Sequence, residues 1–241
     1  MRSWFSLYQT VYWILLGAGI ISVLVFLVLR VTKGGFWGLF SKAVASFFFI
    51  TTAFAAALAN PGHGVFTLMM TLALVFGMAG DIWLDLKWIY PKDDRTFLKA
   101  GIVSFFLGHV LFCASAFAFF GRWTAISVII PIVISLLGAV VNIKCEKLLK
   151  LNYGSVRMPL ALYSFAVLMT GTVSITAMII SGFEPVWTVM AVGALCFMVS
   201  DAVLSKMYFA DGGNTKGRII INHASYYAAQ FLMASTILLI K

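Results

Sequence analysis

The stretch 45–59, ASFFFITTAFAAALA, decides the fold because it runs for four helical turns without a charged side chain. Its apolar residues are continuous and do not alternate with polar ones, a pattern typical of a membrane-spanning helix and unlike a barrel strand. A helix that crosses the hydrocarbon of a bilayer needs roughly 20 apolar residues. The wider stretch 36–59 has that length, so we predict a transmembrane helix there.

The same pattern recurs along the whole chain. Of its 241 residues, 62% are hydrophobic and only 10% are charged, whereas about a quarter of the residues of a soluble domain are charged. The sequence therefore predicts an all-α, polytopic transmembrane bundle of eight helices that forms one domain over residues 1–241. The eight predicted spans are 8–30, 36–59, 64–84, 97–120, 123–142, 156–181, 184–209 and 218–240.

The formal net charge of +9 allows two kinds of partner, nucleic acid or anionic lipid. The predicted spans place 14 of the 17 Lys and Arg residues on one side of the membrane and 3 on the other. The positive-inside rule makes the basic side cytoplasmic and both termini extracytoplasmic. We therefore expect contact with lipid headgroups and no nucleic-acid partner, in a bacterial inner or plasma membrane.

Two segments of the chain are similar to each other. MAGDIWL at 78–84 and MVSDAVL at 198–204 both read Met-x-small-Asp-x-x-Leu, and their predicted helices run in the same direction. Each is followed by a helix with one histidine, His109 or His223. Two parallel four-helix halves would produce this pattern, and so would a chance match between short segments.

Asp81 and Asp201 are the two carboxyl groups inside predicted spans. Each lies in the last part of a helix that runs toward the basic side, so the two should sit at a similar depth in the cytoplasmic half. A charged Asp at the bilayer centre costs about 3 kcal/mol and normally faces the bundle interior. The other six acidic residues fall at helix ends or in loops, where we expect water to reach them: Asp85, Asp93, Asp94, Glu146, Glu184 and Asp211.

Other polar side chains fall at the same level. His223, Tyr226, Tyr227 and Gln230 share one face of the last helix through their i, i+3, i+4, i+7 spacing. Converging polar groups in an apolar bundle predict a ligand site. The structural alternative is that the aspartates bond neighbouring helices, that His109 is a packing histidine, and that the tyrosines belong to an interfacial belt. The remaining candidates are His109, Asn142 and Tyr163.

Two carboxyls that meet in a dry bundle would share one proton and titrate as a pair. A neutral carboxylic acid can give a proton while an ionised partner stabilises a cation or orients water. The sequence contains no G-x-S-x-G, H-E-x-x-H or G-x-G-x-x-G motif. It also lacks four good metal ligands at a recognisable spacing, so we expect acid–base chemistry with no metal and no cofactor.

The sequence resembles the YhhN family of integral membrane proteins, which includes lysoplasmalogenases. The resemblance covers the predicted third to eighth helices and rests on five blocks in order: GDIWLDL (80–86), FFLGHVLFCASAF (105–117), MPLALY (158–163), GALCFMVSDAVLSKMYF (193–209) and YYAAQFL (226–232). It implies an eight-helix enzyme that hydrolyses the vinyl ether bond of lysoplasmalogen to a fatty aldehyde and a glycerophospho-ethanolamine or -choline. The family's two aspartates correspond to Asp81 and Asp201, and its fourth-helix histidine to His109.

On this interpretation Asp81 and Asp201 are catalytic, and the other polar groups orient the acid or bind the substrate. The partners are a lysophospholipid substrate and membrane lipid, with the oligomeric state left open. The alternative is a proton-coupled transporter or a lipid-binding membrane protein that uses the same aspartates. The expected orienting or substrate-binding residues are His109, Asn142, Tyr163, His223, Tyr226, Tyr227 and Gln230, with Lys87 and Lys206 near the headgroup phosphate.

Overall fold

The computed structural model describes residues 2–241, with side chains from residue 6 onward. This part of the chain forms eight α-helices and two short 3-10 helices, and it contains no strand. The all-α prediction is therefore confirmed. The helices are α1 (Arg2–Thr32), α2 (Gly35–Ala59), α3 (Gly64–Ile89), α4 (Asp94–Phe120), α5 (Ala125–Lys144), α6 (Arg157–Ile180), α7 (Pro185–Phe209) and α8 (Lys216–Leu239), and the 3-10 helices are η1 (Pro91–Asp93) and η2 (Gly154–Val156).

The helix ends agree with the predicted spans to within three residues, except at the start of α1, which begins at Arg2 and not at residue 8, and at the end of α3. This helix continues to Ile89, beyond its predicted end at Leu84. The physical reason is that Asp85 is buried inside the bundle and does not end the apolar segment in water. The expectation that water reaches Asp85 is thus wrong, since this residue is only 1% exposed.

Seven of the described helices are long and apolar enough to cross a membrane, and they make this chain an integral membrane protein. α8 has a similar length but is not among the seven. Its hydropathy is lowered by side chains that face the protein interior, where they are buried: Asn222, His223, Tyr226, Tyr227 and Gln230. The polar side chains of α8 are therefore accommodated by packing against other helices and not by contact with lipid.

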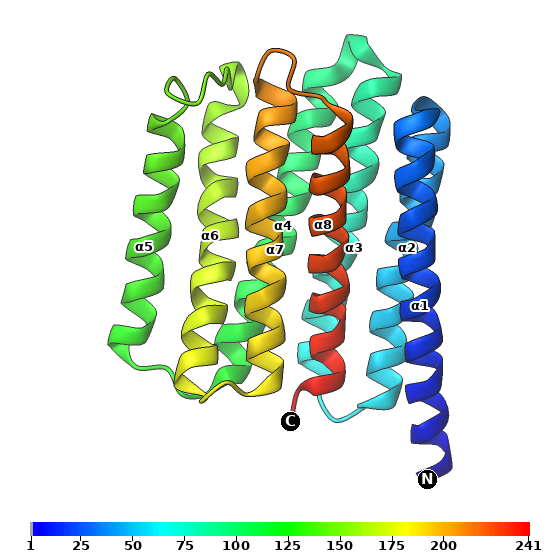
Figure 1. The fold of residues 1–241 in the computed structure, drawn as a ribbon. Coiled ribbons are helices and arrows are strands. Elements are labelled where there is room, and N and C mark those ends of the chain that lie inside the picture. The colour runs from blue at the N-terminus through cyan, green and yellow to red at the C-terminus, as the bar shows by residue number, and fades with distance from the viewer. Residues whose placement is uncertain (1) are drawn as a thin grey trace.

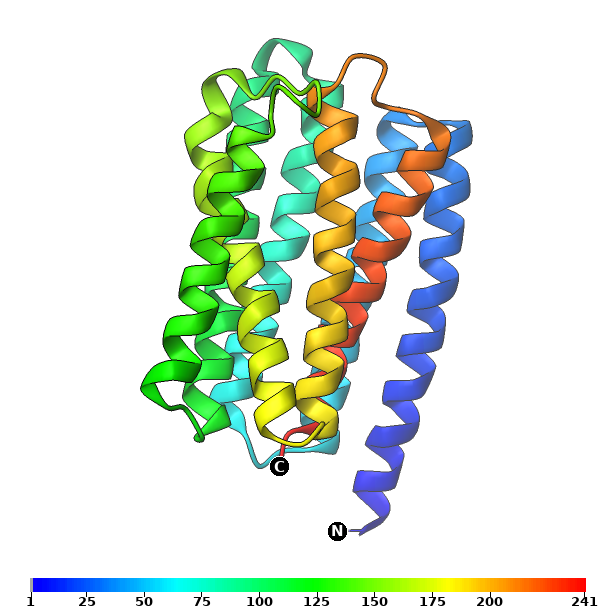
Figure 2. The same cartoon turned by 60° about the vertical axis from the view of Figure 1, so that its left-hand side comes forward.

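Six helices form a closed ring and two lie outside it. The ring follows the contacts α2–α3–α4–α6–α7–α8 and returns from α8 to α2. α1 packs on α2 and α8, while α5 packs on α6 (Figures 1 and 2). The polar residues of α3, α7 and α8 consequently face a shared interior.

Both termini lie at the same end of the bundle, as the predicted eight-span topology requires (Figure 1). The opposite end holds the turns α1–α2, α3–α4, α5–α6 and α7–α8, where most of the Lys and Arg residues lie (Figure 1). We call this end the basic end. Lys42 is an exception, because it is 3% exposed and belongs to the bundle interior.

The two halves of the chain have related helix contacts. Consecutive helices pack together within α1–α4 and again within α5–α8. The last helix of each half also contacts the second helix of the other half, as α4 with α6 and α8 with α2. A parallel 4+4 repeat would give these contacts, although α1 and α3 additionally contact α8.

Candidate active site

Asp81 lies in a buried network of charges that joins α1, α2 and α3. Its carboxylate Oδ1 is 3.1 Å from the Lys42 Nζ, and the same nitrogen lies 3.5 Å from Asp85 Oδ1. Arg30 donates two hydrogen bonds to the Asp85 carboxylate, at 2.9 and 3.0 Å. Two cations thus face two carboxylates, and this balance makes their burial tolerable in an apolar bundle. We call Arg30, Lys42, Asp81 and Asp85 the charge cluster.

Hydroxyl groups complete the surroundings of Asp81. Its Oδ2 accepts hydrogen bonds from Ser46 Oγ at 2.6 Å and from the Tyr226 hydroxyl at 2.7 Å. Gln230 Nε2 donates to the Tyr226 hydroxyl at 2.7 Å, and the Tyr227 hydroxyl lies 3.0 Å from Ser46 Oγ. Three of the four polar residues predicted on α8 therefore connect to Asp81, directly or through one intermediate.

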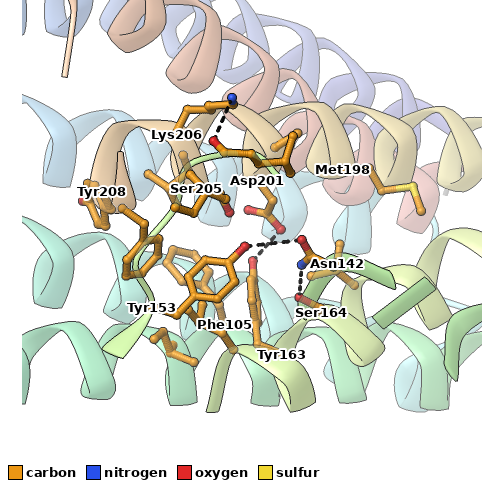
Figure 3. A pocket seen from close by; sticks show the side chains of 18 of the residues that line it. Phe105, Asn142, Tyr153, Tyr163, Ser164, Met198, Asp201, Ser205, Lys206 and Tyr208 are labelled. Atoms are coloured by element: carbon orange, nitrogen blue, oxygen red, sulfur yellow. Dashed lines mark hydrogen bonds between the residues drawn. The ribbon is translucent and has the colours of Figure 1, made fainter. Parts of the chain in front are cut away.

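Asp201 on α7 has different surroundings. The Tyr163 hydroxyl of α6 donates to its Oδ2 at 2.8 Å, and the two side chains point toward each other in Figure 3. Among the side chains from residue 6 onward, no Lys, Arg or His forms an ion pair with Asp201. Asp81 is thus compensated by a lysine, whereas Asp201 is held by a neutral phenol.

A cavity of about 400 Å³ reaches Asp201. Its walls come mainly from α4, α5, α6, α7 and the segment 149–153, and they are mostly apolar (Figure 3). It reaches the molecular surface near the basic end, where Leu149 and Ala202 are exposed. We call it the main cavity. An apolar slot with a few polar groups at its inner end is the form of a ligand site for a long-chain molecule.

Asn142 and Lys206 also line the main cavity, as predicted for substrate-binding residues. Asn142 donates from Nδ2 to Ser164 Oγ at 2.7 Å and accepts from the Tyr153 hydroxyl at 3.4 Å. Lys206 lies nearer the surface, with its Nζ 3.4 Å from the Leu149 carbonyl (Figure 3). Together these side chains add polar groups near a wall that is otherwise apolar.

A much smaller cavity, about 20 Å³, lies on the other side of Asp201. Asp81, His223 and Asn222 line it, and so do Asp201 and Tyr163, which also line the main cavity. We call it the inner cavity. No hydrogen bond joins the carboxyl groups of Asp81 and Asp201 in the described part of the chain. The expected direct carboxyl pair is therefore corrected to two carboxyls that share an enclosed space.

His109, predicted to orient the acid, is 2% exposed on α4 and lines neither cavity. Its Nδ1 lies 3.1 Å from Thr170 Oγ1, and its ring packs edge-on against Phe197 and Tyr163. These contacts match the packing histidine of the structural alternative and place His109 behind Tyr163. Its effect on the site would be exerted through the position of that ring.

Lys87, predicted near the headgroup, lines neither cavity. Its Nζ lies over the ring of Tyr208, 4.0 Å from the centroid, and 5.0 Å from that of Trp88. In side chains from residue 6 onward, no three or more His, Cys, Asp and Glu come together as a metal-ligand group. The prediction of no metal stays a prediction.

The sequence reasoning missed Arg30, Lys42, Ser46 and Asp85. Two spacings in the sequence carry a signal for them: Ser46 follows Lys42 by four residues on the buried face of α2, and Asp85 follows Asp81 by four on α3. Residues four apart share a helix face. A buried aspartate therefore made its i+4 neighbour a candidate for burial too.

A model of the YhhN family matches residues 37–237, most of the chain. This chain belongs to the YhhN family. The matched region runs from the start of α2 almost to the end of α8, so it contains both aspartates and both cavities. No curated protein and no solved structure matched the chain. Membership in the YhhN family makes this a membrane protein of that family, and the roles of individual residues are taken up as proposals.

Proposed function

We propose that this YhhN-family protein is a lysoplasmalogenase, which hydrolyses the vinyl ether bond of a single-chain alkenyl glycerophospholipid. The observation that carries the proposal is Asp201: a carboxyl with no cationic partner, held by Tyr163 at the inner end of an apolar cavity. A carboxylic acid in such a place keeps a proton at lower cost than one beside a lysine. Asp201 is therefore the proposed general acid.

The reaction needs one proton and one water molecule. Asp201 gives its proton to the vinyl carbon β to the ether oxygen, and the C=C electron pair forms the new C–H bond. The resulting oxocarbenium ion is captured by water at the α carbon, which yields a hemiacetal. Its collapse breaks the C–O bond and releases a fatty aldehyde and the glycerol hydroxyl of a glycerophospho-ethanolamine or -choline. No cofactor enters this balance.

Asp81 would act as the anion in this reaction. Its bonds to Lys42, Ser46 and Tyr226 hold it as a carboxylate that lines the inner cavity next to Asp201. A fixed negative charge near a developing cation stabilises the transition state more than the ground state. We therefore assign Asp81 to electrostatic stabilisation of the oxocarbenium ion and Asp201 to proton transfer.

The alkenyl chain would occupy the main cavity and the headgroup would lie at the basic end. Lys206 lines the cavity, and Lys144 and Arg157 flank the turn between α5 and α6, whose segment 149–153 contributes to the cavity wall. These cations suit a phosphate. The positive-inside rule places this end on the cytoplasmic side, so the substrate would enter from the inner leaflet.

The decisive experiment measures free aldehyde from purified protein and lysoplasmalogen for wild type and Asp201→Asn. General acid catalysis contributes about 10²- to 10⁴-fold, so kcat should fall by about that factor. Asp211→Asn, the same change at an exposed residue in the α7–α8 turn, should leave kcat unchanged. A folded Asp201→Asn protein with undiminished aldehyde release would contradict the assignment.

A proton-coupled carrier is the second candidate, and the buried charge cluster favours it because intramembrane ion pairs often mark transport pathways. Transporter sites usually involve helices broken near the midplane, whereas α2, α3, α6, α7 and α8, which carry the aspartates and their partners, each run without interruption. Liposome assays separate the two functions. Movement of lysolipid across the bilayer without aldehyde formation would favour the carrier.

A further inference from the structure

The inner cavity contains a buried nitrogen with no protein partner. His223 on α8 is 5% exposed, and its Nε2 makes no hydrogen bond within the described part of the chain. The imidazole ring of His223 packs edge-on against Phe26, with 5.0 Å between the ring centroids. A buried polar atom without a hydrogen-bond partner destabilises the protein. We therefore expect a ligand in the inner cavity that bonds this nitrogen.

The inner cavity has the size and the lining of a water site. A space of 10–15 Å³ is enough for about one water molecule, provided that it offers two to four polar partners. The inner cavity measures about 20 Å³, and its lining includes Lys42, Asp81, Asp201, Asn222 and His223. It is too small for a lipid chain or a headgroup, so these parts of the substrate must remain in the main cavity.

We propose that the inner cavity binds a single water molecule, hydrogen-bonded to His223 Nε2, and that this water is the nucleophile of the reaction. The proposal rests on the proposed vinyl ether hydrolysis and deepens it. Asp201 lines both cavities, so its carboxyl group is within reach of a substrate in the main cavity and of this water in the inner cavity. His223 becomes a water-positioning residue.

This placement lets one carboxyl group serve both steps. Asp201 first loses its proton to the vinyl carbon and becomes a carboxylate. As the water oxygen bonds to the α carbon, the water proton returns to Asp201, and the acid is regenerated. His223 holds the oxygen in place through one hydrogen bond, and Asp81 stabilises the cation that attracts it. No reactant beyond the substrate and water is required.

The test compares two side chains of similar length at position 223. His223→Gln can place a polar atom near the position of Nε2, whereas His223→Met cannot. Removing one hydrogen bond to the water should slow aldehyde release in His223→Met by about threefold to tenfold, and His223→Gln should recover most of the loss. If Gln and Met both match the wild type, or lose activity equally, His223 does not position the water.

A second readout measures which nucleophile captures the oxocarbenium ion. With methanol in the assay, capture by methanol gives a mixed acetal in which the C–O bond to glycerol remains, and mass spectrometry distinguishes it from aldehyde. A water held next to the α carbon keeps this product low. The ratio of mixed acetal to aldehyde should rise severalfold in His223→Met and stay near the wild-type value in His223→Gln. A ratio unchanged in His223→Met would overturn the proposal.

The water site can also be examined without catalysis. An experimental structure of the wild-type protein that shows ordered solvent should contain a density peak within hydrogen-bond distance of His223 Nε2 in the inner cavity. A clearly dry cavity would reject the site even if aldehyde is released. Absence of aldehyde release with a peak present would instead reject vinyl ether hydrolysis and leave the water site intact.

Discussion

Asp81 and Asp201 occupy corresponding places on α3 and α7 but have contrasting partners. Asp81 is bonded to a lysine and two hydroxyl groups, and Asp201 to a single tyrosine. The similar heptapeptides MAGDIWL and MVSDAVL do not reveal this difference, because the partners come from other helices. The proposed distinction between a fixed anion and a proton donor therefore rests on the fold and not on the motif.

Replacement of Lys42 by Met should destabilise the protein strongly. It would leave Asp81 and Asp85 with Arg30 as the one remaining cation of the charge cluster, and breaking a buried pair costs about 3–5 kcal/mol. The loss can be measured as a lowered midpoint of denaturation in detergent. Lys99→Met, the same change at an exposed residue of α4, should cost less than about 0.5 kcal/mol. Equal effects of the two changes would contradict a stabilising role for the cluster.

Replacement of Tyr163 by Phe should lower kcat for aldehyde release with little change in KM. The change removes the hydrogen bond to Asp201 Oδ2 and keeps the ring. One such bond is worth about 0.5–1.5 kcal/mol, which corresponds to a fall of roughly threefold to tenfold in kcat. Tyr12→Phe is the matched control, because it removes a hydroxyl that bonds Ser235, away from both cavities. A fall of the same size in Tyr12→Phe would refute the specific role.

At the scale of elements, hydrophobic runs predicted the eight helices, since a span must be both long and apolar. The same reasoning failed for charges near helix ends. Lys42 was counted with the surface cations although it lies on the same face of α2 as Ser46 and Phe49, which are buried. Hydropathy assigns a lysine to water by default, and only the position of a carboxylate on the next helix explains its burial.

The site residues were predicted in part for a related reason. The face of α8 was visible as an i, i+3, i+4, i+7 pattern, and it does converge on Asp81. The main cavity was not visible, because it depends on how the five helices α3 to α7 and the segment 149–153 pack. His109 and Lys87 are polar like the site residues, but His109 bonds Thr170 and Lys87 lies over Tyr208, outside both cavities. The spacing of residues in the sequence does not show this.

Replacement of Ala202 by Trp should make the proposed aldehyde-releasing activity selective for short chains. Ala202 lies on α7 at the edge of the main cavity, so an indole there would occupy space that the alkenyl chain needs. We expect aldehyde release from a long-chain lysoplasmalogen to fall by at least about tenfold, with short-chain substrates less affected. Val199→Trp, on the same helix but outside the cavity lining and 51% exposed, should preserve the wild-type preference.

At the scale of the whole molecule, the ring of six helices places the site between the two halves. Asp81 and its partners come from α2, α3 and α8, while the walls of the main cavity come mostly from α5, α6 and α7. The contacts of α4 with α6 and of α8 with α2 close this arrangement. Neither half contains a complete site on its own.

The orientation predicted from the charge distribution can be tested by cysteine labelling. In a background without the native Cys113, Cys145 and Cys196, a cysteine at Gly62 should react with a membrane-impermeant thiol reagent in intact cells. A cysteine at Asp211 should react only after permeabilisation, because the α7–α8 turn belongs to the basic end and should be cytoplasmic. The opposite labelling pattern would place the termini in the cytoplasm.

The polar composition of α8 has a consequence for biosynthesis. This helix is synthesised after α1 to α7, and its hydropathy makes it a poor candidate for spontaneous release into lipid. Its two tyrosines form hydrogen bonds with α2 and α3, which are already made by then, and its glutamine donates to one of these tyrosines, Tyr226. Membrane insertion of α8 should therefore wait until α2 and α3 have formed an acceptor groove, so that its insertion is also the step that completes the polar centre.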